Sequence, residues 1–417
     1  MQISLSPEKN DCILEKMNQI SIKNFGPVRK GYTDDAEGLL NINRVTLFIG
    51  NQASGKSTVA KLISTCTWLE KALVRGDFSI KWLCQYNRFQ HNLCKFQNIQ
   101  DYFNENTYLL YKGMRYDFLY EHGKFNVKDK GTPFLMPQVM YIPAERNLLS
   151  VIEEADRIRN LPQSLFTLLE VYNQARRSLT KSLELPVGGL SLSYDKLNHI
   201  TWISGKDYKV RLAAASSGLQ SLAPLTLVIH YLWQRIQQNT DTEKSQVSVR
   251  EYERLNKEIE HILAQKNVTE EVRAALLKQI PNIRNEYLFG IVEEPEENLF
   301  PESQKSVLYD LLSFIKKGDK NQFIFTTHSP YMLSYITLAE KAYMLLRTAG
   351  FTKQEELNKV VPLGAAIDSA DVSLYQLTDD GRIELLPNVN GLLEDNNYLN
   401  KLMSQTNEDF GTLLDLE

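Results

Sequence analysis

Residues 45–57 read VTLFIGNQASGKS, an apolar run that ends at Gly50 and is followed, after four further residues, by Gly-Lys-Ser. The run predicts a strand, and the apolar spacing of residues 57–74 predicts a helix directly after the loop. A loop of this pattern points its backbone N–H groups at a phosphate, and the positive end of the helix dipole strengthens the attraction. The stretch therefore predicts a phosphate site, with a chance strand–turn–helix as the alternative.

The same loop contains the side chains that a bound nucleoside triphosphate requires. Gly50 and Gly55 permit a tight backbone path, Lys56 can reach the β- and γ-phosphates, and the Ser57 hydroxyl can hold Mg²⁺. ATP and Mg²⁺ are therefore the expected ligands. The residues expected to bind the nucleotide here are Gly50, Asn51, Ala53, Ser54, Gly55, Lys56, Ser57 and Thr58.

Two acidic residues follow a second apolar strand. Residues 287–300 read YLFGIVEEPEENLF, which places Glu293 and Glu294 at the end of that strand. A phosphate site needs one carboxylate in the magnesium shell and another that orients and polarises the attacking water. We assign Glu293 to the metal and Glu294 to the water. The alternative is a solvated acidic turn, since EEPEEN is a charge run.

A third apolar strand, residues 322–327 (QFIFTT), is followed by His328. The strand is expected to be the neighbour of the one that carries the acids, which puts His328 at the same edge of the sheet. There it could contact the γ-phosphate or the attacking water. The alternative is the structural role that a lone histidine at a strand end usually has.

Residues 216–220 (SSGLQ) open an apolar helix. Ser217, Gly218, Gln220 and the N–H groups of this loop form a candidate second anion site at a helix N-terminus. One nucleotide does not need two phosphate-binding loops. The loop is therefore expected to act in trans, on the γ-phosphate of a nucleotide held by another subunit. The alternative is an ordinary N-cap serine.

These elements, in this order, resemble the ABC-type ATPase heads of the RecF/SMC and OLD-like group. The resemblance covers residues 17–336 and rests on NQISIKNFGPV, FIGNQASGKST, SSGLQS, EEPEENLFP with Gln304, and TTHSP. It implies an α/β P-loop fold with a mixed sheet flanked by helices, an antiparallel N-terminal β subdomain and helical insertions. It also implies that Glu294 is the catalytic acid, His328 the switch histidine, and SSGLQ the signature that acts across a dimer.

The chain departs from this family pattern in several places. Glu293 stands where the commoner ABC pattern has Asp, Leu219 replaces a signature glycine, and Ala53 replaces a loop glycine. Residues 141–146 (YIPAER) resemble a stretch of the OLD-like defence ATPases, but Glu145 and Arg146 receive no firm role. The alternative for Arg146 is a surface ion pair. Gln138 is a candidate for the Q-loop glutamine, and the tail lacks the acid pattern of a Toprim nuclease.

The elements predict one large head with a small extension. Residues 17–345 are expected to form the ATPase head, with an irregular insertion at about 79–130 and a charged helical arm at about 237–284. Residues 346–417 are expected to extend the same domain. Short strands are expected at 342–347, 373–378 and 382–386, before a final helix. Residues 190–213 are expected to form one β-hairpin that turns at 205–207.

Composition excludes some classes of protein. The formal net charge is -4, from 47 Lys and Arg against 51 Asp and Glu, so there is no global basic field for nucleic acid. The four cysteines have no metal-site spacing and are expected to be reduced thiols of a cytoplasmic protein. The first residues do not have the pattern of a signal peptide, and no apolar run reaches the roughly 18 residues of a membrane helix.

The favoured interpretation is an ATP-driven switch that closes as a homodimer, or a higher homo-oligomer, and acts on a separate partner. A paired effector such as a nuclease, as in bacterial antiphage systems, is the expected context. The alternative is a RecF-like DNA-repair head, because residues 81–96 interleave Lys81, Arg88 and Lys95 with aromatic residues. An amphipathic helix explains the same stretch. A transporter's ATPase subunit and a small-molecule kinase are further alternatives.

Overall fold

The computed structural model describes residues 18–152, 160–238 and 285–389, together with 392–393, 397–414 and 416 near the C-terminus. The predicted helical arm at about 237–284 lies outside these residues, apart from its first two positions. Three of the four cysteines lie in the described segments, and Cys66, Cys84 and Cys94 are all unpaired thiols, as expected.

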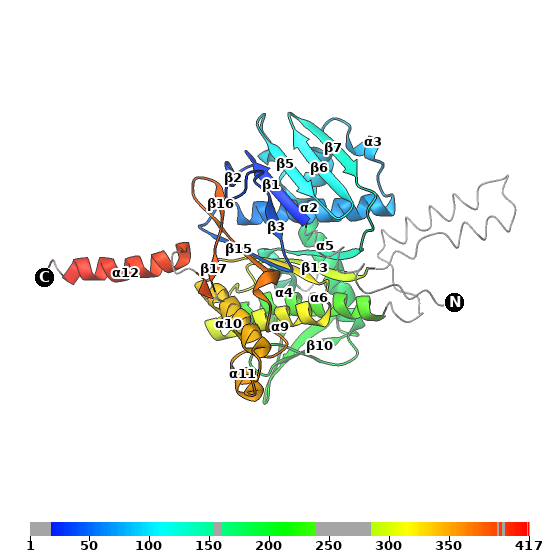
Figure 1. The fold of residues 1–417 in the computed structure, drawn as a ribbon. Helices are drawn as coiled ribbons and strands as arrows, with labels where there is room; N and C mark the ends of the chain where they lie inside the picture. The colour runs from blue at the N-terminus through cyan, green and yellow to red at the C-terminus, as the bar shows by residue number, and fades with distance from the viewer. Residues whose placement is uncertain are drawn as a thin grey trace, which may run out of the picture.

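A seven-stranded mixed sheet forms the centre of the molecule, in the order β2-β16-β15-β4-β14-β13-β8 (Figure 1). The five strands from β15 to β8 run parallel, and β16 is antiparallel to β15. The predicted mixed α/β sheet is thereby confirmed. The strands are β2 (Gly31–Tyr32), β4 (Val45–Gly50), β8 (Pro137–Ile142), β13 (Tyr287–Glu293), β14 (Gln322–Thr326), β15 (Val372–Leu377) and β16 (Arg382–Leu385).

The central strands are mostly apolar because both faces of the sheet are covered. In β4, Val45, Leu47 and Ile49 belong to one hydrophobic core, and Phe48 belongs to the other. Successive side chains of a strand point to opposite faces, so an uninterrupted apolar run is what a doubly covered parallel sheet requires. Because its side chains enter the cores on both faces, β4 lies at the centre of the fold.

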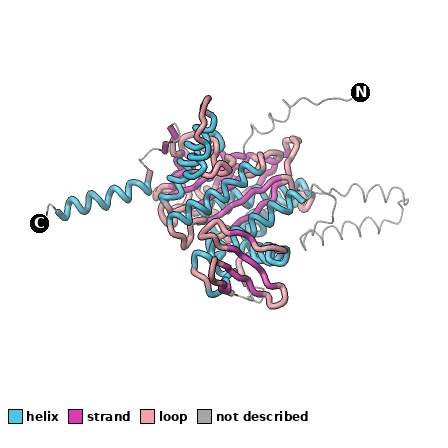
Figure 2. Tube along the Cα trace, turned by 90° about the horizontal axis from the view of Figure 1, so that it is seen from below, coloured by secondary structure: helices cyan, strands magenta, loops and turns pink. Residues whose placement is uncertain are grey.

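Helices cover the two faces of this sheet (Figures 1 and 2). The helix α2 (Lys56–Arg75) packs on one face, and the other core holds α5 (Gln163–Ser178), α6 (Ser217–Gln238), α9 (Pro301–Lys317) and α10 (Pro330–Arg347). Both figures show α12 (Tyr398–Leu414), the predicted final helix, extending away from the body. Short α-helices among the described residues are α3 (Ile80–Leu83), α4 (Leu148–Val151) and α11 (Gln354–Val360).

A five-stranded antiparallel sheet packs over α2, in the order β3-β1-β5-β6-β7. The sequence predicts an irregular insertion at residues 79–130. The irregularity is wrong, because three of these strands lie within that range. The strand β6 alternates buried Tyr116, Phe118 and Tyr120 with less buried residues, so tyrosine serves as an apolar residue here. The strands are β1 (Asn18–Lys23), β3 (Leu40–Ile42), β5 (Tyr108–Lys112), β6 (Tyr116–Glu121) and β7 (Lys124–Asp129).

Two further expectations need correction. The predicted single hairpin at 190–213 is part of a four-stranded sheet, made of β9 (Leu183–Glu184), β10 (Ser191–Asp195), β11 (Ile200–Ser204) and β12 (Lys209–Arg211). The predicted strand at 342–347 is the last part of α10. In that helix, Met332, Ile336 and Ala339 are buried at the spacing of a helix, and the same period continues into the misread residues.

The C-terminal segment completes the central sheet. The strand β15 pairs in parallel with β4, so Leu377 lies opposite Gly50, and β16 returns after a turn at Gly381 with φ 80°. The strands expected at 373–378 and 382–386 are confirmed. The segment predicted as an extension thus supplies the strand beside the phosphate loop.

A buried carboxyl group fastens the antiparallel sheet to α2. Glu70 is 1% exposed, and its Oε1 accepts hydrogen bonds from the backbone N–H groups of Arg115 (2.6 Å) and Tyr116 (3.0 Å). A Cβ on Gly113 would lie 2.5 Å from Glu70 Oε2, so a larger residue at this turn would push against the Glu70 carboxyl group. Burial raises the pKa of Glu70 to about 7, against the lowering effect of those hydrogen bonds.

We expect the stability contributed by Glu70 to fall as the pH rises. Its pKa is raised from 4.5 to about 7 on folding, so between these values the unfolded chain has lost the proton and the folded chain keeps it. Unfolding is therefore favoured progressively across this window, by at most about 3 kcal/mol for such a shift. Denaturant unfolding at about pH 4 and about pH 8 should show this loss in the wild type and not in Glu70→Gln. Equal pH dependence of the two proteins would contradict the assignment.

Candidate functional site

The phosphate loop (residues 50–57) has the backbone that its sequence predicts. The strand β4 ends at Gly50, and Gly55 has φ 105° at the N-cap of the 20-residue helix α2. A Cβ on Gly50 would lie 2.5 Å from Leu377 O, so β15 passes too close for any other residue. Ala53 has φ 62°, a conformation that favours glycine, which is the residue it replaces in the family pattern.

Lys56 is held inside this loop. It is 5% exposed, and its Nζ donates to Gly50 O (2.9 Å) and Asn51 O (2.8 Å). Burial lowers the pKa of Lys56 to about 8, although nearby Glu294, Glu296 and Glu293 favour the charged form. The ammonium group is therefore fixed at the start of a helix whose first N–H groups have no partners within that helix. This arrangement suits an anionic ligand.

The acid turn (residues 293–298) begins at the carboxyl end of β13. Glu293 is buried and lies opposite Thr326 in the parallel pairing of β13 with β14. Its Oε1 is buried without a close hydrogen bond among the described residues, and the nearby Tyr141, whose pKa is raised mainly by burial and further by this carboxylate, is its neighbouring hydroxyl. Such an acceptor fits a metal-bound water. The neighbouring Glu294 has φ 44°, and its N–H donates to Thr326 O at 2.9 Å.

The histidine loop (residues 327–329) lies against the acid turn. His328 Nε2 is 3.3 Å from Glu294 Oε1, and this hydrogen bond lowers the pKa of Glu294. Their side chains remain 40% and 37% exposed, so both can reach a ligand. The structure thus confirms the predicted neighbouring strands and brings the two residues together at one edge of the sheet.

Two further side chains, which the sequence analysis gave no role of their own, brace this pair. Glu296 accepts hydrogen bonds from the Thr327 hydroxyl (2.5 Å) and the His328 N–H (2.9 Å), and its burial raises its pKa. Gln304 on α9 accepts from the Ser329 hydroxyl at 2.6 Å. The run EEPEEN contains four acids, and nothing in its order indicates which of them turns inward. Gln304 stands out in the sequence only as part of the family pattern.

Arg146 is the largest fully buried side chain in the described chain, so the alternative of a surface ion pair is wrong. It lies in a 3-10 turn (Ala144–Asn147) directly after β8, and burial lowers its pKa. Its guanidinium group bonds backbone carbonyls of the acid turn and of α6. Glu145, in the same turn, is exposed.

The signature loop (residues 216–220) leads into α6 beside the acid turn. Ser217 is exposed at the first position of the helix, while a Cβ on Gly218 would meet Asn298 O at 2.6 Å. The Gln220 side-chain amide donates to Ala213 O (2.9 Å), so this residue holds its own loop. Within one chain, α6 packs near β8 and β13. The strand β14 lies between β13 and β4, the strand that leads into the phosphate loop, so the signature loop lies beside the acid turn and away from that loop.

Gln138 does not belong to the site. It pairs with Leu288 near the start of β13, at the opposite end from the acids, and its Oε1 accepts from Asn285 at 2.5 Å. The prediction of Gln138 as the Q-loop residue is therefore wrong. The residue after β8 that lies at the same edge of the sheet as the acid turn is Arg146, not Gln138.

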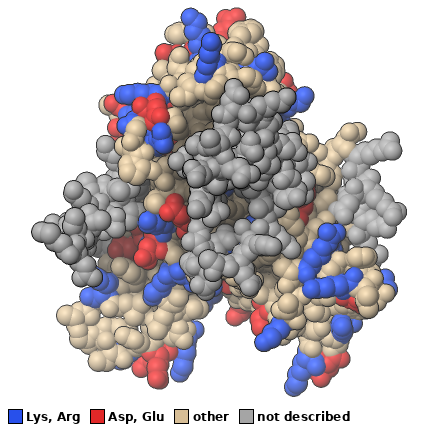
Figure 3. Space-filling model, turned by 90° about the vertical axis from the view of Figure 1, so that its right-hand side faces the viewer, with Lys and Arg blue, Asp and Glu red and all other residues tan. Residues whose placement is uncertain are grey.

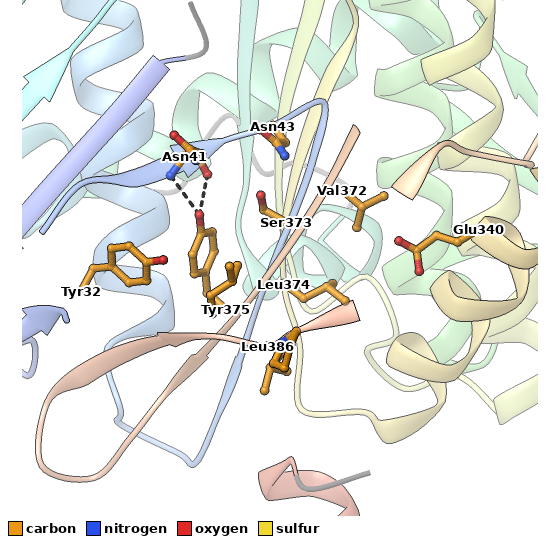
Figure 4. Close-up of a pocket in the computed structure, with 11 residues that line it drawn as sticks. Tyr32, Asn41, Asn43, Glu340, Val372, Ser373, Leu374, Tyr375 and Leu386 are labelled. Atoms are coloured by element: carbon orange, nitrogen blue, oxygen red, sulfur yellow. Dashed lines mark hydrogen bonds between the residues drawn. The ribbon is translucent and has the colours of Figure 1, made fainter. Parts of the chain in front are cut away.

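A cavity of about 290 Å³ lies elsewhere on the central sheet (Figure 4). Its lining includes Asn43 and Val372, at the amino ends of β4 and β15, and Tyr375, whose hydroxyl accepts from the Asn41 N–H at 2.9 Å. Ligands of parallel sheets bind at the carboxyl ends of the strands, where Gly50 lies. This cavity is therefore separate from the candidate nucleotide site.

In the stretch 81–96, Trp82 and Phe89 pack within the chain, whereas Tyr86 is exposed. Phe89 is buried and stacks on Phe125 with ring centroids 4.2 Å apart, and Arg88 lies 4.9 Å above the Trp82 ring. On the face shown in Figure 3, the basic (blue) and acidic (red) side chains of the described residues are mixed with one another. Across the part of the chain that the structure describes, none of the helices has the length and apolar content to cross a membrane.

A match to one family model supports an ATPase domain in part of the chain. Residues 146–333, a little under half of the 417-residue chain, match a family model described as an AAA ATPase domain. The matched range holds Arg146, the signature loop, the acid turn and the histidine loop, and the phosphate loop precedes it. Among solved structures, the SMC head domain from Thermotoga maritima is similar, with 12% identity, a TM-score of 0.34 and coverage of 91% of this chain and 97% of that chain. No curated protein matches.

Proposed function

We propose that this chain binds and hydrolyses ATP with Mg²⁺ and uses the reaction as a conformational switch. The observation that carries the proposal is the contact of Glu294 with His328 (3.3 Å) at the edge of the sheet where the phosphate loop begins. The strands concerned are adjacent, in the order β4-β14-β13, and their carboxyl ends meet there. The AAA ATPase match, which includes both residues, supports the same reaction.

The residues present fit ATP and Mg²⁺. Lys56 and the N–H groups at the start of α2 would hold the phosphates, together with the other loop residues named above. Ser57 and the buried Oε1 of Glu293 would hold the metal and its water shell. Bound Mg²⁺ would neutralise charge on the phosphates.

Glu294 is the candidate base for the attacking water. Its lowered pKa keeps it ionised at neutral pH, and its carboxylate reaches solvent. The hydrogen bond to His328 fixes one of its oxygens, which leaves the other to accept from the water. His328 would orient this carboxylate and contact the γ-phosphate. Water attack releases ADP and phosphate.

The signature loop is proposed to act in trans. Ser217 is exposed, and β14 separates β13, against which α6 packs, from β4. Two heads would place Ser217, Gly218 and Gln220 of each on the nucleotide of the other, and closure would act on a separate effector. An antiphage role in a cytoplasmic system follows from the resemblance alone. The RecF-like alternative has less support from residues 81–96, because Trp82 stacks on Phe78 and Phe89 on Phe125, which leaves Tyr86 as the exposed aromatic ring of the stretch.

One domain is proposed for the head and its extension. The expected boundary at 345–346 falls inside α10, which ends at Arg347, and the strand β15 of the tail lies beside β4. Because β15 contacts the phosphate strand along its length, the tail belongs to the same folding unit.

Phosphate release tests the function. The wild type should release phosphate from ATP only with Mg²⁺, and His328→Ala should slow this turnover by about 10–10²-fold, because Glu294 loses its orienting partner. His122→Asn is the matched control, since His122 is an exposed histidine in the β6–β7 turn with φ 49°. A wild type that binds ATP but releases no phosphate would contradict hydrolysis.

A further inference from the structure

Arg146 makes an unusually complete set of contacts for one side chain. It is 0% exposed, and its guanidinium group bonds the backbone of three separate segments. Nη1 donates to Glu293 O (2.7 Å) and to Pro143 O (3.3 Å), Nη2 donates to Glu294 O (2.7 Å), and Nε donates to Ser221 O (3.1 Å). Nη2 also lies 3.6 Å from Glu297 Oε2. A planar fork with five donors suits such a junction, which an ammonium group cannot reproduce.

These contacts fix the backbone of Glu294. Its φ of 44° lies in a region that residues with side chains rarely adopt, and the surrounding structure must hold it there. Arg146 binds its carbonyl, Thr326 O accepts from its N–H, and His328 binds its side chain. Removal of the Arg146 bond would free the carbonyl side of this strained residue.

The third segment at the junction is the beginning of α6. Arg146 Nε binds the carbonyl of Ser221, one turn after Ser217. Two neighbouring contacts join the same elements, since Asn298 Nδ2 lies 3.3 Å from Ser221 Oγ and Asn298 O closely approaches Gly218. The signature loop and the acid turn are therefore linked directly through Arg146 and Asn298.

We propose that Arg146 is a positioning residue that couples the signature loop to Glu294, so that engagement of Ser217 aligns the carboxylate with the attacking water. The proposal rests on the proposed ATPase function. It assigns Arg146 no contact with ATP, because all of its hydrogen bonds go to the protein backbone. A purely structural arginine would support the fold without any link to Ser217.

The test compares full-length wild type, Arg146→Lys and the matched surface control Arg177→Lys, since Arg177 is exposed on α5. Each is assayed for folding by thermal melting, for ATP binding, and for kcat and KM of phosphate release. Arg146→Lys should fold but melt at a lower temperature, because several buried carbonyls lose their donors. It should still bind ATP like the wild type, with KM within about 3-fold and kcat lower by about 10²-fold. Arg177→Lys should match the wild type.

A double-mutant cycle with Ser217→Ala tests the coupling itself. In the wild-type background Ser217→Ala should lower kcat, and in the Arg146→Lys background it should have little further effect. Effects that multiply would overturn the coupling. So would a normal kcat for Arg146→Lys, or a loss of ATP binding that tracks a lower melting temperature. If Arg146→Lys does not fold, Asn298→Ala replaces it under the same criteria. A wild type without any ATPase activity would instead refute the proposed function.

Discussion

Glu294→Gln is expected to bind ATP as the wild type does while its turnover falls by about 10²–10⁴-fold. The amide keeps the size of the carboxylate and can still contact His328, now 3.3 Å from Glu294 Oε1, but it does not accept the proton of the water. Phosphate-release kinetics and equilibrium binding of labelled ATP measure the two quantities separately. Wild-type turnover in this variant would remove Glu294 from the role of base.

The same variant should reveal the trans site. With hydrolysis blocked, Mg-ATP is expected to hold two heads together, so the mass in solution should rise when nucleotide is added. Glu302→Gln is the matched control, because Glu302 is an exposed acid in the first turn of α9. Adding Ser217→Ala should weaken the ATP-dependent association. An unchanged monomer that still binds ATP would contradict the trans role of Ser217.

Lys56→Ala is expected to weaken ATP binding by about 10²-fold or more. Hydrogen bonds from a charged donor contribute about 1.5–3 kcal/mol each, and two of them to the phosphates correspond to that loss. Calorimetric titration with ATP measures the change. Because Lys56 also binds Gly50 O and Asn51 O, the melting temperature is measured alongside to separate a loss of binding from a disordered loop.

Lys61→Ala is the comparison for this change. It removes one positive charge from the same helix, one turn after the loop, and leaves the contacts of Lys56 in place. It should bind ATP like the wild type. Equal losses of affinity in both variants would show that general charge, and not the Lys56 contact, attracts the nucleotide.

The elements of the site whose neighbours lie close in sequence were predictable. The phosphate loop needs only a strand, eight residues and a helix, and the glycines at 50 and 55 allow only a few backbone paths. The acids and His328 follow apolar strands that are recognisable by composition. Because a parallel sheet aligns the carboxyl ends of its strands, the sequence order of these motifs already indicated a shared edge.

Other features depend on contacts between distant segments. Arg146 reads as one charged residue among others, and only its burial against Glu293, Glu294 and Ser221 shows what it joins. Glu296 is indistinguishable from its acidic neighbours until Thr327 and His328 are placed beside it. Gln138 appeared suitable as a residue type, but the register of β8 against β13 puts it at the wrong end of the sheet.

The sequence by itself therefore determined the chemistry that the phosphate loop and the strand ends offer, because local spacing dictates where those side chains lie along the chain. The tertiary structure alone decided which acids face inward, that residues 108–129 join the β subdomain, and that β15 lies beside β4. The physical reason is that burial and strand pairing involve residues far apart in sequence. A single buried guanidinium group can then hold together three segments whose relation no local pattern records.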